Sequence, residues 1–500
     1  MSKSKAQKRK RQAQAAASSG PPSKVTKTTT VEVSNGGRSP TATTILAPSN
    51  LHTVISDEEL EITVETLETL SQYPSLIKGK SCKDLRVAVY DFRKASTTGN
   101  NASTDGGNLT SRITAALADE KYLDARILLA EMRIRSEEPK LGALCRWVRD
   151  LDVISRLSTV RSAEDAAPAV RSDNERDLLN VLDAVLRTVG PIDSNPAAVT
   201  HPTSQVVLQD IWDLRPSTPS EQVHAAVQNG TIFDTLQKDK ISSLLRIIET
   251  TPALERKPPN HHDAILYTTA PDAVLLSQTP ETPIIHEPHP VVPGLSLARN
   301  LLSPHECKSI IAAGEAANFV PDAPIRDDGQ VSILAHNFYW VIDTAFHDKL
   351  WARIAPYVPS SINGRQARGI NRRFRVYRYV PGAEYRCHID GAWPPSGILP
   401  NDKYVYDASP PGKKQSSLFT FLLYLNDEFE GGETTFFLPS AKEGTLNAYP
   451  VRPVMGAVAI FPHGETKGAL LHEGTGVRKG AKYIIRSDVE YDVEPTVGVD

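Results

Sequence analysis

The spacing of hydrophobic positions divides the 500-residue chain into contrasting regions. Over residues 56–250 apolar side chains recur every three or four positions, the pattern of amphipathic helices. After Pro293 they alternate or form short apolar runs between glycine, proline and aspartate, the pattern of strands. Residues 1–55 contain few large apolar side chains and cannot bury enough surface to fold. We therefore predict a disordered tail over 1–55, a helical region over 56–250, a β-rich domain over 291–492 and a short tail over 493–500.

Start and stop signals divide the helical region into separate helices. Ser56 and Glu59 form a capping-box signature ahead of the first apolar stripe. The periodicity predicts helices after Ser56, after Ser81, over 122–157 with a break at Pro139, over 177–189 and over 234–249. Paired helices suggest a helical-hairpin array, similar to tetratricopeptide-type modules, that binds a protein partner. No regular internal period is present, and an irregular helical bundle fits the pattern equally well.

Nine prolines between residues 251 and 293 predict a proline-rich linker, or an extended wrapping segment, over 251–290. A short helix is expected at 304–317. Strands are expected at 374–380, 418–425, 457–461 and 483–491. Because no long helix separates these strands, the pattern favours an antiparallel sandwich or barrel, and an α+β multidomain chain as a whole.

Composition excludes several classes of protein. Hydrophobic residues make up 40% of the chain, but no window approaches eighteen consecutive apolar residues, so no membrane span is expected. The first residues are basic without an apolar core, which argues against a secretory signal peptide. The four cysteines lie far apart and form no CxxC pair, so a zinc ribbon and a disulfide scaffold are not expected. An intracellular protein is predicted.

Charge is distributed unevenly along the chain. The first 30 residues hold eight Lys or Arg and no acid, whereas the net charge of the whole chain is −3. The basic run from Lys8 to Arg11 is typical of a nuclear localisation signal, a nucleic-acid tether or a solvated tail. A cytoplasmic and/or nuclear location is therefore expected. The acidic remainder argues against a broad surface for nucleic acid.

One short segment of the β-rich region carries metal-ligand chemistry. In His388-Ile389-Asp390 the histidine and the aspartate share one face of a strand, because side chains at i and i+2 point the same way. His472 is a candidate third ligand. Two imidazoles and one carboxylate are typical of non-haem Fe(II) oxygenases. Spacing alone also permits an ordinary buried His–Asp pair, and a similar triplet, His261-His262-Asp263, is predicted to be a solvated loop because no strand pattern surrounds it.

The sequence segments around these residues strengthen the interpretation that they form a metal site. They are Arg378-Tyr379-Val380-Pro381-Gly382, Phe421-Leu422-Leu423-Tyr424-Leu425-Asn426-Asp427, Glu430-Gly431-Gly432-Glu433-Thr434, Gly456-Ala457-Val458-Ala459-Ile460-Phe461-Pro462 and His472-Glu473-Gly474, with Leu302-Ser303-Pro304-His305-Glu306-Cys307 at the start. Their order resembles the catalytic domain of prolyl 4-hydroxylases, within the 2-oxoglutarate- and Fe(II)-dependent dioxygenases. The resemblance covers about residues 290–492.

The resemblance implies a double-stranded β-helix (jelly roll) with iron at one open end. His388, Asp390 and His472 match the iron ligands of the family. The implied cofactors are Fe(II), 2-oxoglutarate as cosubstrate, O2 and L-ascorbate. The implied reaction hydroxylates a substrate while 2-oxoglutarate is decarboxylated to succinate and CO2.

The resemblance also implies how 2-oxoglutarate is bound. Lys482, ten positions after His472, matches the basic residue that pairs with its C5 carboxylate. A cation is physically required opposite a buried carboxylate, and a strand can aim it inward. Arg486 lies on the same face of the strand and is the second candidate. Tyr379 matches a tyrosine that hydrogen-bonds the same carboxylate, and Tyr385 a tyrosine near the substrate.

Nearby residues receive structural interpretations. Gly431 and Gly432 allow a tight strand connection, so Glu433 is not assigned to the metal. Cys387 is expected to pack on the face opposite His388. His463 is expected to be a turn residue. The stretch from Ser396 to Gln415 is the expected substrate loop.

The leading hypothesis is an intracellular hydroxylase that acts on a prolyl residue of a protein, with the helical region available for a protein partner. Alternatives are a hydroxylase of a non-prolyl substrate, an interaction scaffold with an inactive oxygenase domain, and an oxidative nucleic-acid demethylase. The presence of all candidate ligands disfavours the scaffold. The absence of an evident basic and aromatic groove in the sequence disfavours the demethylase.

Overall fold

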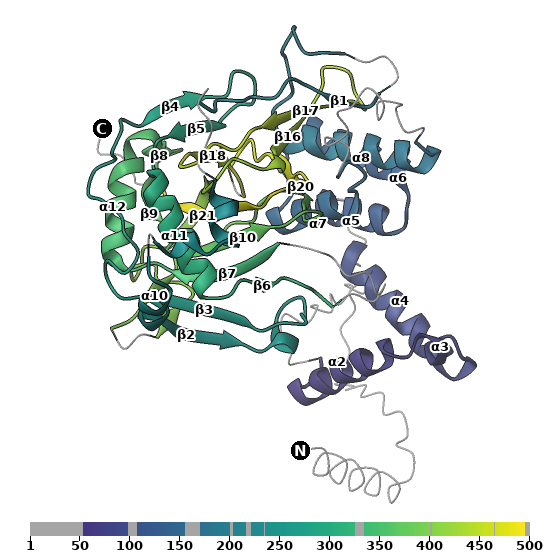
Figure 1. The fold of residues 1–500 in the computed structure, drawn as a ribbon. Coiled ribbons are helices and arrows are strands. Elements are labelled where there is room, and N and C mark those ends of the chain that lie inside the picture. Colours follow the sequence, from purple (N-terminus) through teal and green to yellow (C-terminus); the bar gives the residue numbers. More distant parts are fainter. Residues whose placement is uncertain are drawn as a thin grey trace, which may run out of the picture. The chain divides into compact units, whose positions relative to one another are not determined.

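A computed structural model describes residues 54–98, 108–155, 171–200, 204–216, 222–234, 236–325, 335–400, 403–464 and 466–495 (Figure 1). The basic run at Lys8 to Arg11 and nearly all of the predicted tail lie outside these residues. Within them, no helix is both long and apolar enough to cross a membrane.

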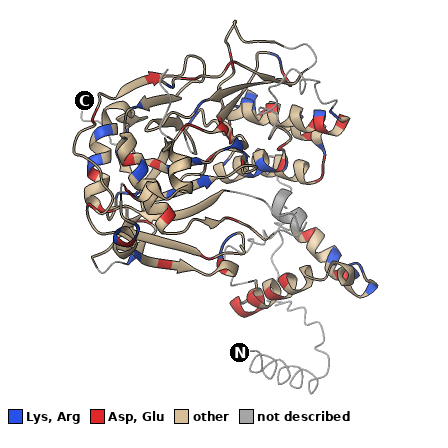
Figure 2. Cartoon of the chain, in the orientation of Figure 1, with Lys and Arg blue, Asp and Glu red and all other residues tan. Residues whose placement is uncertain are grey.

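The chain divides into two compact units, residues 1–88 and 89–500. The first contains helices α2 (Asp57–Ser71) and α3 (Pro74–Ile77) and the first turn of α4 (Lys83–Thr98). The predicted capping box begins α2: the Ser56 hydroxyl accepts the Glu59 N–H, and the Glu59 carboxylate accepts the Ser56 N–H. Acidic residues lie along α2 (Figure 2), and none of the residues of this helix is buried.

The second unit has helices on both sides of its sheets. They are α5 (Leu109–Ala118), α6 (Tyr122–Ile134), α7 (Leu141–Asp150), α8 (Asp173–Val189), α9 (Val223–Gln228), α10 (Lys238–Leu244), α11 (Pro304–Ala316) and α12 (Thr344–Ile354). The predicted break at Pro139 separates α6 from α7, and α8 ends before Gly190 as predicted.

Two large sheets form the centre of this unit. The five-stranded sheet has the order β1 (Val206–Leu208), β17 (Leu446–Val451), β16 (Thr434–Pro439), β19 (Leu471–Gly474) and β11 (Tyr385–His388). The main path of the twelve-stranded sheet is β2 (Leu245–Thr251), β3 (Ala264–Thr269), β7 (His336–Val341), β10 (Arg373–Tyr379), β21 (Lys482–Asp492), β14 (Gln415–Tyr424), β18 (Val458–Pro462), β5 (Ser296–Arg299) and β4 (Ile285–Pro288). Short strands complete the list: β6 (Val320–Pro321), β8 (Ser361–Ile362), β9 (Arg365–Ile370), β12 (Gly397–Ile398), β13 (Tyr404–Val405), β15 (Glu430–Gly431) and β20 (Val477–Lys479). The predicted α+β class is confirmed.

Side chains alternate across each sheet and so build separate cores on its two faces. On β10, Tyr377 and Tyr379 lie in the core between the two sheets, with Phe436 of β16. Phe374 and Val376 lie in the core that α11 and α12 cover. The result is a layered arrangement of helix, sheet, sheet and helix (Figure 1). The four strands predicted from periodicity correspond to β10, β14, β18 and β21.

Helices α5 to α8 cover the outer face of the five-stranded sheet. Leu129, Trp147 and Leu182 share one core with Phe437 of β16 and Leu471 of β19. The prediction of a helical region separate from the β-rich domain is therefore wrong for these helices. The apolar stripes of these helices, which suggested a free-standing module, are buried against strands such as β16 and β19 that come much later in the chain.

The predicted proline-rich linker is also wrong, since β3 and β4 lie within residues 251–290. The prolines interrupt no central strand: Pro258 and Pro259 lie between β2 and β3, and Pro288 ends β4 at the sheet edge, where proline is tolerated. The helix predicted over 234–249 is limited to α10. From Leu245 onward the chain forms β2, because pairing with β3 outweighs the apolar periodicity.

Candidate active site

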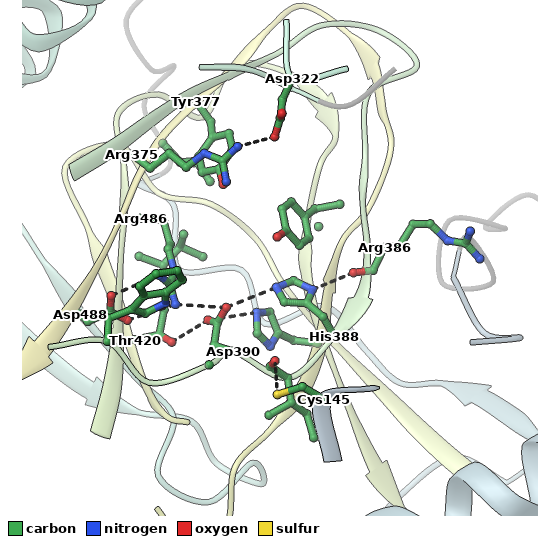
Figure 3. Close-up of a pocket in the computed structure, with 18 of the residues that line it drawn as sticks. Cys145, Asp322, Arg375, Tyr377, Arg386, His388, Asp390, Thr420, Arg486 and Asp488 are labelled. Carbon is green, nitrogen blue, oxygen red and sulfur yellow. Dashed lines mark hydrogen bonds and ion pairs between the residues drawn. The ribbon is translucent and has the colours of Figure 1, made fainter. Parts of the chain in front are cut away.

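A cavity of about 810 Å³ lies among strands β10, β11, β14, β16, β19 and β21 (Figure 3). It is lined by His388, Asp390 and His472 and also by Tyr379, Lys482 and Arg486. All six residues that the sequence suggested as a site therefore share one cavity. Helix α7 contributes Cys145 and Arg149 to its wall.

The His–Asp–His cluster is built by the pairing of β11 with β19, which places His388 directly opposite His472. Nε2 of His388 lies 3.5 Å from Oδ1 of Asp390, and Nε2 of His472 lies 3.7 Å from Oδ2. One potential ligand atom from each residue falls within 4.8 Å of the others. No other group of this kind occurs among the described residues. The His261-His262-Asp263 triplet, predicted to be a loop, lies between β2 and β3.

The second nitrogen of each imidazole fixes the orientation of its ring. Nδ1 of His388 lies 2.7 Å from the carbonyl oxygen of Arg386, and Nδ1 of His472 lies 3.1 Å from that of Leu470. A carbonyl oxygen only accepts, so each Nδ1 carries the hydrogen. In the neutral form each Nε2 then presents its lone pair toward Asp390, as a metal ligand must.

The surroundings hold two of these groups in the protonation states that metal binding requires. Burial disfavours the charged form of Asp390, but Arg486 and the two histidines outweigh it and hold the pKa of that carboxyl well below its usual range. Burial and the neighbouring His388 lower the pKa of His472 to about 4. At neutral pH an ionised carboxylate and a neutral imidazole therefore face each other.

A buried polar network supports Asp390 from behind. Nη2 of Arg486 lies 3.3 Å from Oδ1 of Asp390 and 3.1 Å from Oδ1 of Asp488 (Figure 3). The Thr420 hydroxyl donates to Oδ2 of Asp390 at 2.7 Å. Arg486, a candidate 2-oxoglutarate ligand from the sequence, is thus engaged with two carboxylates.

His463 belongs to this network, and its interpretation as a simple turn residue is wrong. The side chain is buried, with Nδ1 2.7 Å from the Thr420 hydroxyl and Nε2 2.9 Å from the Ser417 hydroxyl. Burial lowers its pKa to about 3, so the ring is neutral. Because Thr420 donates to Asp390, it accepts from Nδ1, and Nε2 accepts from Ser417.

The hydrogen bonds of this network therefore all donate in one direction, from the backbone of Trp393 toward Asp390. The Trp393 N–H donates to Ser417, which donates to His463, which donates to Thr420, which donates to Asp390. Trp393 itself lines the cavity and is 38% exposed. The chain of hydrogen bonds ties one wall of the cavity to the carboxylate.

Lys482 lies at the other side of the cavity, with its ammonium group buried. Nζ donates to the carbonyl oxygen of Gly432 at 2.7 Å and lies 5.4 Å from the centre of the Tyr379 ring. Burial lowers the pKa of Lys482 to about 7, although Glu433 partly opposes the shift. Glu433 itself pairs with Arg452 rather than with the cluster, in agreement with its predicted structural role.

Residues from the helical layer hold β11 in place from outside the cavity. Arg386 pairs with Asp152 at 3.0 Å, and the Cys387 N–H donates to the Ser155 hydroxyl at 2.9 Å. The Cys145 thiol donates to the carbonyl oxygen of Ile389 (Figure 3). As predicted, Cys387 packs away from the cluster, in the core under α5 to α8.

The family model for the 2OG-Fe(II) oxygenase superfamily matches residues 374–487, which include every residue of the cluster. The chain carries a 2OG-Fe(II) oxygenase domain. The predicted resemblance to 2-oxoglutarate-dependent dioxygenases is thereby confirmed for the C-terminal region. No curated protein is significantly similar to the chain.

Solved structures match part of the chain at low identity. A viral collagen prolyl hydroxylase from Paramecium bursaria Chlorella virus-1, in complex with 2OG, is 21% identical, covers 40% of this chain and 97% of its own, and has a TM-score of 0.26. A prolyl-4-hydroxylase from Pseudomonas putida is 18% identical over 39% of this chain and 91% of its own, with a TM-score of 0.25. A prolyl hydroxylase from Trichoplax adhaerens, in complex with a hypoxia inducible factor peptide fragment, is 15% identical over 39% of this chain and 83% of its own, with a TM-score of 0.27. Similarity at this level says nothing about the substrate of the oxygenase domain.

Sequence reasoning missed Thr420, His463 and Asp488 as parts of the site. Thr420 lies within an apolar strand, two residues before Leu422, where a polar residue signals a buried hydrogen bond. Asp488 is buried on β21 beside Arg486 and Ser487, so no apolar run marked it. The interruption of the apolar strand β14 by Thr420 was the available signal.

Proposed function

We propose that the chain is an Fe(II)- and 2-oxoglutarate-dependent hydroxylase of a protein substrate, most specifically of a prolyl residue. The observation that carries the proposal is the convergence of two imidazoles, each with Nδ1 bonded to a backbone carbonyl oxygen, and an ionised carboxylate on one point of the cavity wall. Structural zinc sites instead prefer four closed N or S ligands, whereas this donor set fits non-haem iron.

His388, Asp390 and His472 would hold the iron. The ionised carboxylate of Asp390 and the neutral ring of His472 suit the role, because metal ligands must be deprotonated at the binding atom. Iron bound there supplies the oxidising chemistry of the family, in which O2 and 2-oxoglutarate give succinate, CO2 and a hydroxylated substrate. The Thr420 hydroxyl and the Arg486 guanidinium hold the carboxylate of Asp390 in one orientation.

Lys482 is the proposed anchor for the distal carboxylate of 2-oxoglutarate, with Tyr379 beside it. Its ammonium group is in the cavity wall and is bonded to a neutral carbonyl oxygen, so it can pair with an incoming anion. Arg486 is the weaker candidate because Asp390 and Asp488 already neutralise it. Of the two candidates that the sequence left open, the proposal favours Lys482.

The substrate site would occupy the remainder of the cavity. A volume of about 810 Å³ is near the upper end for small-molecule sites and leaves room for a side chain beside 2-oxoglutarate. The rings of Tyr377, Tyr385 and Trp393 line it. Aromatic faces suit a saturated ring such as that of proline, which supports the prolyl assignment.

Four further elements belong to the same proposal. The two sheets would form the double-stranded β-helix of the family, supported by their antiparallel central strands. L-Ascorbate would restore Fe(II) after uncoupled turnover. The intracellular location, cytoplasmic or nuclear, remains a prediction, and the basic run from Lys8 to Arg11 lies outside the described residues. A protein partner bound through the helical region also remains a prediction.

The experiment that tests the function is anaerobic titration of the full chain with Fe(II) and then 2-oxoglutarate, followed by succinate measurement in air. We expect one equivalent of each to bind and succinate to form. If the iron-loaded protein neither binds 2-oxoglutarate nor releases succinate, the hydroxylase proposal is wrong and an inactive scaffold becomes the better interpretation.

Replacing Thr420 with valine is expected to weaken Fe(II) binding roughly tenfold to a hundredfold, the usual effect of removing a hydrogen bond to a metal ligand. Valine keeps the shape but removes the donor to Asp390 and the acceptor for His463. Thr435→Val is the matched control, since the Thr435 hydroxyl is buried without a hydrogen-bond partner. Equal Fe(II) affinities for the two variants in anaerobic titration would argue against a supporting role for Thr420.

The affinity for 2-oxoglutarate is expected to fall as pH rises above about 7. Burial lowers the pKa of Lys482 to about 7, so the free protein progressively loses the cation that binds the carboxylate. The decrease can reach about tenfold per pH unit, because both carboxylates of 2-oxoglutarate stay ionised throughout. Calorimetric titration between pH 6.5 and 8.5 measures it. Lys482→Arg should give a flat profile, and a flat profile for the unmodified protein would contradict the prediction.

A further inference from the structure

Four half-buried arginines line the cavity, and one of them differs from the others. Arg486 pairs with Asp390 and Asp488, while Arg375 and Arg256 both pair with Asp322 (Figure 3 for Arg375). Arg373 makes no ion pair and no side-chain hydrogen bond with any part of the chain that the structure describes. A half-buried guanidinium without an anion is unusual, because desolvating a charge is costly unless it is paired.

Arg373 is held in place by aromatic rings. Its guanidinium carbon lies 4.8 Å from the centre of the Tyr339 ring and 6.0 Å from that of Tyr404. Its Nε is buried and has no hydrogen-bond partner. Two rings orient the cation and exclude water, but they satisfy none of its N–H donors, which therefore remain available to a ligand.

The location of Arg373 relative to the proposed iron site follows from strand register. Arg373, Arg375, Tyr377 and Tyr379 share one face of β10, and all four line the cavity. Arg375 lies opposite Arg486, which contacts Asp390. Along β10, Arg373 lies two residues, or about 7 Å, from Arg375, which is level with the cluster. It lies on the side of the cluster opposite to Lys482, which pairs with Tyr379 at the other end of β10. A peptide bound in extended form would need about two to four residues to reach from the cluster to the guanidinium of Arg373, when the length of the arginine side chain is included.

The outer wall of this pocket belongs to the segment that the sequence indicated as the substrate loop. Tyr404 lies on β13, which pairs with β12 in a short hairpin. Its hydroxyl is 3.0 Å from the hydroxyl of Ser396, so the ring is fixed from both ends. The cation therefore lies between the sheet and the loop, where a peptide leaving the active site would pass.

We propose that the substrate is an anionic peptide segment, with a carboxylate or phosphate two to four residues from the hydroxylated residue bound by Arg373. This inference rests on the proposed function and narrows its substrate class. The guanidinium can offer paired N–H donors to either anion, which suits bidentate recognition. The other cations that line the cavity, Arg149, Lys257 and Arg386, are exposed. Arg149 and Arg386 also pair with Asp150 and Asp152.

Pooled peptide libraries test the proposal with the full chain. Each pool fixes proline at the centre and aspartate, phosphoserine, serine or lysine at one position within six residues of it, and randomises all other positions. Peptide-stimulated succinate release is the measurement. We expect the pools with a fixed anion at one side, two to four positions away, to exceed the serine and lysine pools. The ratio of the aspartate to the phosphoserine pools distinguishes the two sources of negative charge.

Arg373→Gln is expected to reduce the preference for the anion roughly tenfold to a hundredfold, while the serine pools remain unchanged. Arg372→Gln is the matched control, because that neighbouring arginine bonds to Thr344 and does not line the cavity. Both variants should bind 2-oxoglutarate and release succinate without peptide as the unmodified protein does.

The outcomes separate the two levels of the proposal. If the unmodified protein does not bind 2-oxoglutarate, the function itself is wrong. If it releases succinate but no pool with a fixed anion stands out, or if Arg373→Gln keeps the full preference, the anionic-peptide proposal is overturned and the function stands. A charge reversal, Arg373→Glu, should shift the preference toward the lysine pools.

Discussion

Replacing His388 with alanine is expected to lower the affinity for Fe(II) by at least about a hundredfold and to stop succinate release. Loss of a hydrogen bond to a metal ligand typically costs tenfold to a hundredfold, so loss of a ligand should cost no less. The two donors that remain, Asp390 and His472, would be left facing each other without a third. Anaerobic titration measures the affinity, and succinate assays in air measure turnover.

The chain contains its own control for this experiment. His261 also lies two residues before an aspartate, but in a loop between β2 and β3 rather than on a paired strand. His261→Ala should leave both measurements unchanged. Normal Fe(II) binding by His388→Ala, or an equal loss in both variants, would show that the strand pairing of β11 with β19 does not create the metal site.

Lys482→Met is expected to reduce the affinity for 2-oxoglutarate about a hundredfold while leaving Fe(II) binding within about twofold. Methionine keeps the apolar stem but removes the cation, and a buried carboxylate without its partner costs several kcal/mol. Glu433 should remain satisfied, since it pairs with Arg452 and accepts from the Thr475 hydroxyl. Calorimetric titration of the iron-loaded protein with 2-oxoglutarate, without oxygen, measures the effect.

Two variants define the cause of that loss. Lys479→Met removes a solvent-exposed lysine three positions away, paired at the surface with Glu430, and should bind 2-oxoglutarate normally. Lys482→Arg keeps the charge and should retain part of the affinity. If Lys482→Met binds 2-oxoglutarate as well as the unmodified protein, Lys482 is not the anchor and Arg486 must be reconsidered.

Local patterns predicted the strands that carry the site. The apolar runs that correspond to β14 and β18 are almost entirely buried, whereas β10 alternates between arginine and apolar or aromatic residues. Short runs and alternation of this kind, bounded by turn residues, favour strands. The His388–Asp390 spacing likewise depends only on the alternation of a strand. The helix start at Ser56 and the break at Pro139 were found because capping and proline act within a few residues.

Predictions failed where distant parts of the chain meet. The stripes of α6 and α8 looked like a module of their own, but they are buried against strands far along the chain. The segment after Leu245 has helical periodicity, and only its pairing with β3 in the tertiary structure shows that it is a strand. His463 looked like a turn residue because neither Thr420 nor Ser417 is near it in sequence.

Element types and the shared face of His388 and Asp390 follow from interactions between near neighbours, and these can be read along the chain, whereas His472 was indicated by the resemblance to a family. The protonation of Asp390 and His472, the engagement of Arg486 with two carboxylates and the unpaired guanidinium of Arg373 follow from burial and from charges on other strands. Those quantities depend on distance in space, which no periodicity records. For this chain, the residues capable of the chemistry were visible in one dimension, whereas their electrostatic state and the cation we assign to substrate recognition required three.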